Sequence, residues 1–177
     1  MVARLTSQIA GGTEFIVPMG ERADPQTVQF GNHVDTEPVG VLAWEATRIA
    51  SGIPRIGLDT DARTIPNEIG LYATHLDKGC YRGQETVARV HNLGRPPRRL
   101  TMLMLDGSDA ELPDPGASVI LEGRKVGQLG GVAMHHELGP VGLALLKRNV
   151  SVDAVPTVDG VAAVSYTHLR AHETRED

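Results

Sequence analysis

Two consecutive prolines near the middle of the chain, Pro96 and Pro97, separate two halves of different sequence pattern. Proline lacks an N–H donor and fixes an extended backbone, so no helix can continue through this pair. The Glu122-Gly123 pair further along is a hairpin signal. Short apolar runs separated by glycine-rich breaks follow the prolines, at residues 100–105, 117–121, 125–134, 141–146 and 158–163. This pattern predicts an antiparallel barrel or sandwich over residues 96–163.

Before the prolines, apolar residues recur at helical spacing across residues 39–50, which predicts a helix there. Gly52 is expected to end this helix in a left-handed conformation, and Pro54 prevents its continuation. The expected inner face consists of Val39, Leu42, Ala43, Ala46, Ile49 and Ala50. The remaining positions, Trp44, Glu45, Thr47 and Arg48, are then expected on the flanks or the outer face.

A second, shorter helix is predicted at residues 84–93, with Val87, Val90 and Leu93 inward and Gly94 at its end. Residues 55–70 are too polar for a buried strand and predict a loop, which either borders a site or is a solvated connector. Short strands are expected at residues 15–17 and 27–30.

The composition indicates the cellular compartment of the protein and excludes some classes of binding partner. The single cysteine among 177 residues cannot form an internal disulfide, which favours a reducing cytosol. A net charge of −5 and 3% aromatic residues disfavour direct binding of nucleic acid. No apolar stretch approaches the roughly 20 residues that cross a bilayer. We expect a cytoplasmic monomer without a membrane or direct nucleic-acid partner.

Both ends of the chain have unusual sequences. The turn at residues 11–13 leads straight into a strand, and domains seldom open this way, so we expect a front portion to be missing. Residues 164–177 have no amphipathic period and resemble the translation of a sequencing adaptor. We interpret them as a non-native tail, with a genuine polar terminus as the alternative.

Histidines give no convincing metal site. The candidates are His135 and His136 with Glu137, together with the scattered His33, His75 and His91. Adjacent residues on a strand point to opposite faces, so His135 and His136 are not expected to chelate one ion. We therefore predict no metal site.

The run that carries chemistry is Lys78-Gly79-Cys80-Tyr81-Arg82-Gly83-Gln84-Glu85. Cys80 lies between two cationic residues and just ahead of a predicted helix N-terminus, and each of these influences stabilises a thiolate. The alternative is that the cysteine is a small buried hydrophobe.

Polar residues at the start of the second helix have two interpretations each. Gln84 and Glu85 could read the donor and acceptor edge of a pterin ring, or simply cap the helix. Arg89, one turn after Glu85, could pair with that carboxylate or face an anionic ligand tail. Spacing alone does not separate these interpretations.

Several motifs, in order, resemble the YgfZ family of folate-binding, aminomethyltransferase-like proteins. They are Ala43-Trp44-Glu45-Ala46, Arg48-Ile49-Ala50-Ser51-Gly52-Ile53-Pro54-Arg55, Thr64-Ile65-Pro66-Asn67-Glu68, the run 76–85, and Val87-Ala88-Arg89. The resemblance covers most of residues 14–163. It implies an α+β fold: residues 1–95 form the C-terminal part of a folate-binding domain, and residues 96–163 form a small antiparallel β-barrel.

The resemblance also implies a function and a set of site residues. The function is tetrahydrofolate-dependent assistance of iron–sulfur cluster assembly or repair, in support of tRNA-modifying iron–sulfur enzymes. Folate and these enzymes or their assembly machinery are the implied partners. Cys80 is the implied functional thiol, Lys78, Tyr81 and Gln84 shape its loop, and Glu85 is a folate-side contact. The implied role is that of an accessory protein more than a classical enzyme.

Two alternatives stay open. The first is the folate-dependent aminomethyltransferase of glycine cleavage, which shares the general signature. The second is a non-catalytic binding or scaffold module, in which Cys80 is structural and the arginines at 95, 98 and 99 dock an acidic partner or RNA. The simpler interpretation of those arginines is solvated charge at a domain boundary.

Overall fold

The computed structural model describes residues 3–6, 13–16, 39–70, 79–108 and 111–166. The N-terminal half contains β1 (Ala3–Thr6), β2 (Thr13–Ile16), α1 (Val41–Ala50), the 3-10 helix η1 (Pro66–Glu68) and α2 (Gln84–Leu93). The C-terminal half contains β3 (Arg98–Leu105), β4 (Ser118–Leu121), β5 (Arg124–His135), β6 (Gly139–Lys147), β7 (Thr157–Val158) and β8 (Val161–Tyr166). The strand expected at 27–30 lies outside the described residues.

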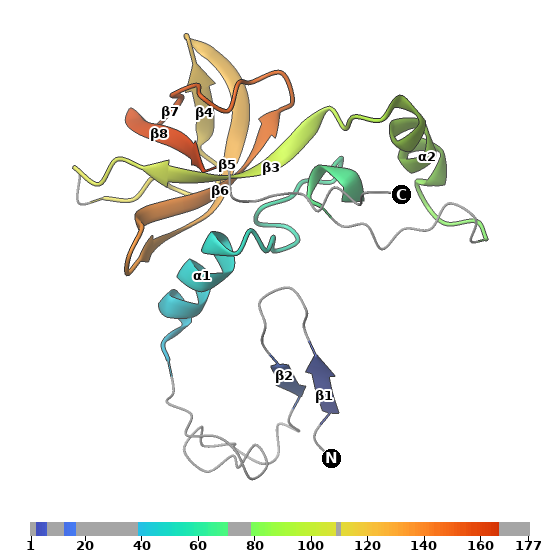
Figure 1. Cartoon of the computed structure of the whole chain (residues 1–177), viewed down its shortest axis with the longest axis horizontal. Coiled ribbons are helices and arrows are strands. Elements are labelled where there is room, and N and C mark those ends of the chain that lie inside the picture. The colour runs from blue at the N-terminus through green and yellow to red at the C-terminus, as the bar shows by residue number, and fades with distance from the viewer. Residues whose placement is uncertain (1–2, 7–12, 17–38, 71–78, 109–110, 167–177) are drawn as a thin grey trace, which may run out of the picture.

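Strands β3 to β8 form a closed antiparallel barrel in the order β3-β6-β5-β4-β7-β8 (Figure 1). Closure comes from β8, which pairs with β3 so that Tyr166 lies opposite Met102 and Ala163 opposite Leu105. A closed barrel leaves no unpaired strand edge. The predicted small antiparallel β-barrel is therefore confirmed. β1 and β2 form a separate antiparallel pair, which places the expected strand near residue 15 in a hairpin.

Two tight hairpins in the barrel have the same backbone conformation in their turns. Glu122 and Gly123 have φ values of 50° and 74°, and Asp159 and Gly160 have 49° and 87°. Positive φ at both central residues is the geometry of two-residue hairpin turns. The first hairpin was predicted. The single strand predicted at 158–163 is wrong, because the second turn divides that region into β7 and β8, and β8 continues to Tyr166.

Two apolar clusters share the strands of the barrel. The interior is filled by Leu103, Leu105, Val119, Leu129, Ala144, Leu146, Val158 and Ala163. The second cluster joins α1 to the outside of the barrel and consists of Ala46, Ile49, Met102, Ala133, Val141 and Leu143. β6 contributes to both clusters, so it is buried on both faces, as its continuous apolar sequence indicates.

The end of α1 follows the predicted chemistry. Gly52 has a φ of 69°, and its N–H donates to the Ile49 carbonyl at 2.9 Å. The N–H of Ile53 reaches back to the Arg48 carbonyl at 3.0 Å. This pair of bonds is a Schellman motif, which satisfies carbonyls that the helix end would otherwise leave unpaired.

The predicted faces of α1 need correction. Ala46 and Ile49 face the barrel as expected, but Ala43 is exposed, and Val39 and Leu42 are 75% and 77% exposed. Arg48, expected on a flank or the outer face, is instead almost completely buried. Arg48 is buried because it pairs with Asp59 on the loop that follows α1. The spacing of apolar residues along the helix gives no sign of such a charged partner.

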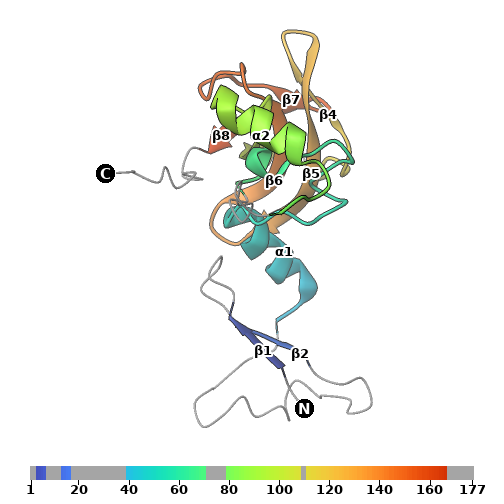
Figure 2. The same cartoon turned by 90° about the vertical axis from the view of Figure 1, so that its right-hand side faces the viewer.

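The second helix has the predicted bounds. α2 covers Gln84–Leu93 and ends at Gly94, whose φ is 72°, and Val87 is buried as expected. α2 contacts η1 and is joined to β3 through the proline pair, while α1 lies against β5 and β6 (Figures 1 and 2). Within the described residues, no helix is long and apolar enough to cross a bilayer.

Candidate functional site

Cys80 lies in the turn that precedes α2, and its side chain is exposed and not in a disulfide. Gly83 has a φ of 83° and forms the N-cap, a conformation that glycine adopts without steric cost. The Tyr81 carbonyl accepts a hydrogen bond from the Gln84 N–H at 3.2 Å, which closes the turn. An exposed thiol just ahead of a helix N-terminus is accessible to a reactant. The alternative interpretation of Cys80 as a buried hydrophobe is therefore wrong.

The other predicted site residues follow along the same segment. Tyr81 and Gln84 are half-buried, whereas Glu85 and Arg89 are exposed. No side chain caps the N-terminus of α2, so the capping interpretation of Gln84 and Glu85 is wrong. Glu85 and Arg89 are both described and form no ion pair with each other, which leaves both charges available to a ligand. Lys78 lies outside the described residues.

A buried ion pair connects α1, the following loop and β5. Arg48 Nη1 donates to Asp59 Oδ2 at 2.7 Å, and the two side chains are 2% and 0% exposed. Asp59 also accepts hydrogen bonds from the backbone N–H of Gly131 at 2.6 Å and of Arg55 at 2.7 Å. Arg48 Nη2 also donates to Glu45 Oε2 at 2.7 Å. Each buried charge thus has a counter-charge and hydrogen bonds, as burial requires.

A second charged link joins the same loop to β3. Arg98 donates to Glu68 at 2.8 Å through both Nε and Nη2, and to Asp61 at 2.8 Å through Nη1. Its neighbour Arg99 donates to the carbonyl oxygens of Arg148 and Val150. The interpretation of residues 98 and 99 as solvated boundary charge is therefore wrong. Their guanidinium groups are occupied within the fold, which weakens the case for an RNA-docking patch.

Asp61 predicts a dependence of stability on pH. The hydrogen bonds from Arg98 hold the pKa of Asp61 well below its ordinary value of 3.8. A lowered folded-state pKa stabilises the protein above the ordinary value, and this stabilisation is lost as the pH falls below it. We expect the free energy of unfolding to decrease between about pH 5 and pH 2, and to decrease less steeply in Asp61→Asn. Urea unfolding across this range measures both slopes.

Asp153→Asn is the control for that experiment, because no described residue forms an ion pair with this exposed aspartate. It should retain the slope of the unmodified chain. Asp61 is 39% exposed, so solvent screening makes its contribution modest. An Asp61→Asn slope parallel to that of the unmodified chain would show that the Arg98 link does not stabilise the fold through this charge.

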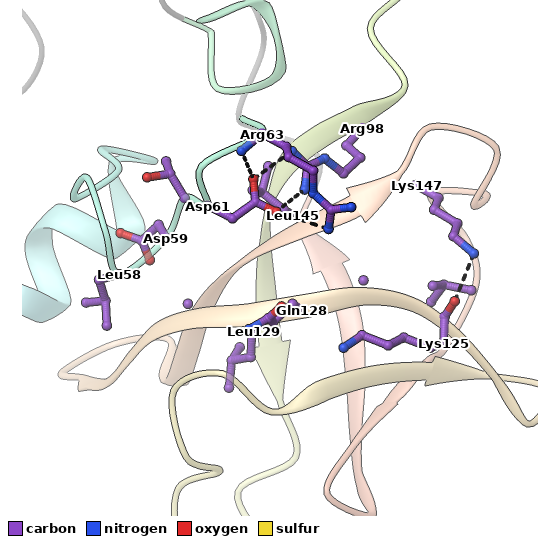
Figure 3. Close-up of a pocket in the computed structure, with 14 residues that line it drawn as sticks. Leu58, Asp59, Asp61, Arg63, Arg98, Lys125, Gln128, Leu129, Leu145 and Lys147 are labelled. Atoms are coloured by element: carbon purple, nitrogen blue, oxygen red, sulfur yellow. Dashed lines mark hydrogen bonds and ion pairs between the residues drawn. The ribbon is translucent and has the colours of Figure 1, made fainter. Parts of the chain in front are cut away.

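A pocket of about 380 Å³ opens between this loop and the barrel. Leu58, Thr60 and the two aspartates line the loop side, and β5 and β6 supply the opposite wall. Figure 3 shows Lys125 and Lys147 on one side, Leu58 and Asp59 on the other, and Arg63 and Arg98 above. The loop at 55–70 therefore borders a pocket and is not only a solvated connector. The sequence contains no local motif for this pocket, because its walls are distant along the chain.

The histidine pair differs from expectation. The rings of His135 and His136 stack with centroids 4.4 Å apart, so the prediction that they point to opposite faces is wrong. β5 ends at His135, whose Nδ1 accepts hydrogen bonds from the N–H groups of Glu137 and Leu138 in the turn. In the described part of the chain, no three His, Cys, Asp or Glu side chains gather closely enough to hold a metal ion. His33 and His75 lie outside that part.

Curated proteins similar to this chain carry two kinds of name. A protein of Arabidopsis thaliana named as a chloroplastic transferase is 37% identical over 93 residues, which are 52% of this chain and 21% of the relative. The tRNA-modifying protein YgfZ of Colwellia psychrerythraea is 36% identical over 80 residues, 44% of this chain and 24% of the relative.

The tRNA-modifying protein YgfZ of Escherichia coli is 37% identical over 82 residues, 45% of this chain and 24% of the relative. No family model matches the chain. The matched segments span about a quarter of the length of these relatives or less. Over part of its length, the chain is thus similar to proteins of the YgfZ family.

Proposed function

We propose that this chain is part of a cytosolic, tetrahydrofolate-dependent protein that assists iron–sulfur cluster assembly or repair and thereby supports tRNA-modifying iron–sulfur enzymes. The observation that carries this proposal is the match to proteins named tRNA-modifying protein YgfZ. The exposed thiol of Cys80 supports it, because a thiol that acts on a cluster or on sulfur must be accessible. One thiolate is too few to hold a cluster alone, so Cys80 would need further ligands from elsewhere to do so.

The folate contact is proposed for the first turns of α2. Gln84 offers an amide and Glu85 a carboxylate, which suit the donor and acceptor edge of a pterin. Arg89 follows one turn later and suits an anionic tail. These side chains are exposed or half-buried on one short helix. They would therefore form one wall of a folate site, with the remaining walls supplied from outside the described residues.

A chimaera tests the proposal. The 82 matched residues of this chain replace the matching segment of Escherichia coli YgfZ, and the chimaera is expressed in a strain that lacks its own YgfZ. We expect the chimaera to restore tRNA modification by iron–sulfur enzymes, and Cys80→Ser to abolish that restoration, because the oxygen is a far weaker nucleophile and metal ligand than the thiolate. The modified nucleosides are measured by mass spectrometry of total tRNA.

Thr86→Ser, an equally small change at an exposed position of α2, is the matched control and should restore modification fully. Protein levels are compared by immunoblot so that loss of function is not confused with loss of protein. Full restoration by Cys80→Ser at equal protein level would remove the thiol from the mechanism.

A second candidate is a folate-dependent aminomethyltransferase, and the transferase name of the Arabidopsis thaliana relative favours it. If this candidate is right, the protein should restore glycine cleavage in a strain that lacks its own aminomethyltransferase. Restoration of glycine cleavage without restoration of tRNA modification would favour this candidate. The reverse result would favour the iron–sulfur function.

A further inference from the structure

The pocket between the 58–63 loop and the barrel contains more positive than negative charge. Its acidic residues are already matched: Asp59 is paired with Arg48, and Asp61 is paired with Arg98. Arg98 also pairs with Glu68, and Arg63 Nη2 lies 3.9 Å from Asp61 Oδ2, so these two arginines match the charges of Asp61 and Glu68. Lys125 and Lys147 also line the pocket, and neither forms an ion pair with a carboxylate of the described residues. The local excess is therefore two positive charges.

The two lysines are held next to each other by the barrel. β5 and β6 pair so that Gly127 lies opposite Leu146, and Lys147 Nζ donates to the backbone carbonyl of Lys125 at 3.0 Å. The lining between the lysines and the loop includes Gly127 and Gly130, and the Asp59 side chain packs against Gly130. Gly127 is required by packing, because a Cβ would lie 2.6 Å from the Leu145 carbonyl oxygen. Both lysines therefore line the pocket on the side opposite Leu58 and Asp59 (Figure 3).

The rest of the lining suits the uncharged body of a small molecule. Leu58, Val126 and Leu145 provide apolar contact, while Gln128 and Thr60 provide hydrogen-bonding groups. A volume of about 380 Å³ falls within the range of roughly 300–1,000 Å³ that small-molecule sites occupy. A pocket with mixed lining and a pair of cations at one end is suited to a ligand that carries its charge at one end.

We propose that this pocket binds a small-molecule dianion, carrying carboxylate or phosphate groups, with Lys125 and Lys147 as its charge-binding residues. None of the described residues 79–89 lines the pocket, so this inference does not depend on the proposed function. Phosphate and carboxylate share the chemistry that recruits ammonium groups, and a separate probe represents each: inorganic pyrophosphate and glutarate.

Titration of the 177-residue chain at an ionic strength of about 0.15 M, where exposed charges more than about 8 Å apart are largely screened, tests the proposal. Isothermal calorimetry gives the affinity, and shifts of the Gly127 and Gly130 amide signals locate the site. We expect at least one probe to bind, and Lys125→Gln with Lys147→Gln to weaken its binding by about tenfold or more, because charge-assisted hydrogen bonds are lost. Lys125→Arg with Lys147→Arg should retain most of the affinity, since both charges remain.

Arg124→Gln with Arg148→Gln is the matched control. These exposed arginines are the immediate neighbours of the two lysines but do not line the pocket, and the variant changes the net charge by the same amount. We expect it to change affinity by less than about twofold. Equal losses in the two double variants would show unspecific attraction to a basic surface and overturn the proposal. Binding of neither probe to the folded, unmodified chain would also overturn it.

Discussion

Arg48→Met is expected to lower the free energy of unfolding by about 3–5 kcal/mol, because it leaves the Asp59 carboxylate buried without its counter-charge. Methionine retains an unbranched apolar stem, so most of the loss reflects charge and not packing. The same arginine also holds the Ile53 carbonyl at 2.7 Å, which helps close the turn after α1. Chemical denaturation monitored by circular dichroism measures the change.

Two further variants separate the charge effect from other causes. Adding Asp59→Asn to Arg48→Met removes the unpaired charge, so the double variant should be more stable than the single one. Arg55→Met removes an arginine that pairs with the same Glu45 but is 56% exposed, and should cost at most about 1 kcal/mol. A double variant no more stable than Arg48→Met would show that packing, and not the buried charge, dominates.

Gly130→Ala is the second large effect, with an expected loss of about 1–3 kcal/mol from overpacking. A Cβ at this position would lie 2.7 Å from the Asp59 Cα and still closer to Asp59 Oδ1. The loop would have to move away from β5, which would break the hydrogen bond from the Gly131 N–H to Asp59. Denaturation gives the loss of stability, and the amide signal of Gly131 should shift at the same time.

Gly40→Ala provides the control for that substitution. A Cβ there meets no atom within 4 Å, and the backbone φ of −68° is one that alanine adopts freely. Gly40 is the N-cap of α1, where alanine is disfavoured, so we expect a loss of at most about 1 kcal/mol. If Gly130→Ala cost no more than this, the close approach of the loop to β5 would not contribute to stability.

The elements that could be predicted from sequence are those whose boundaries depend on local backbone chemistry. Gly52 and Gly94 end the two helices in left-handed conformations, and Glu122-Gly123 forms the expected hairpin. The Asp159-Gly160 turn has the same chemistry but was missed, because the two-residue strand before it is too short to give an alternating pattern. The domain division at 95 and the origin of residues 164–177 stay predictions.

The candidate site was only partly accessible to sequence reasoning. The sequence identified Cys80 and the first turn of α2, because a glycine-bounded run ahead of a helix is a local pattern. It did not identify the pocket, whose two lysines are 22 residues apart and are joined only by strand pairing. A single lysine near a hairpin has no distinguishing pattern of its own.

By itself, the sequence determined where the two helices end, the Glu122-Gly123 hairpin, the antiparallel strands after the proline pair, and the thiol-bearing turn. These features depend on interactions between residues a few positions apart. Only the tertiary structure decided that Arg48 faces inward and that Arg98 is occupied, because their partners lie on the 59–68 loop. Asp59 and Gly131 are 72 residues apart, and such pairs meet only when the loop packs on the barrel. Burial in that interface makes those charges structural and leaves Lys125 and Lys147 available to a ligand.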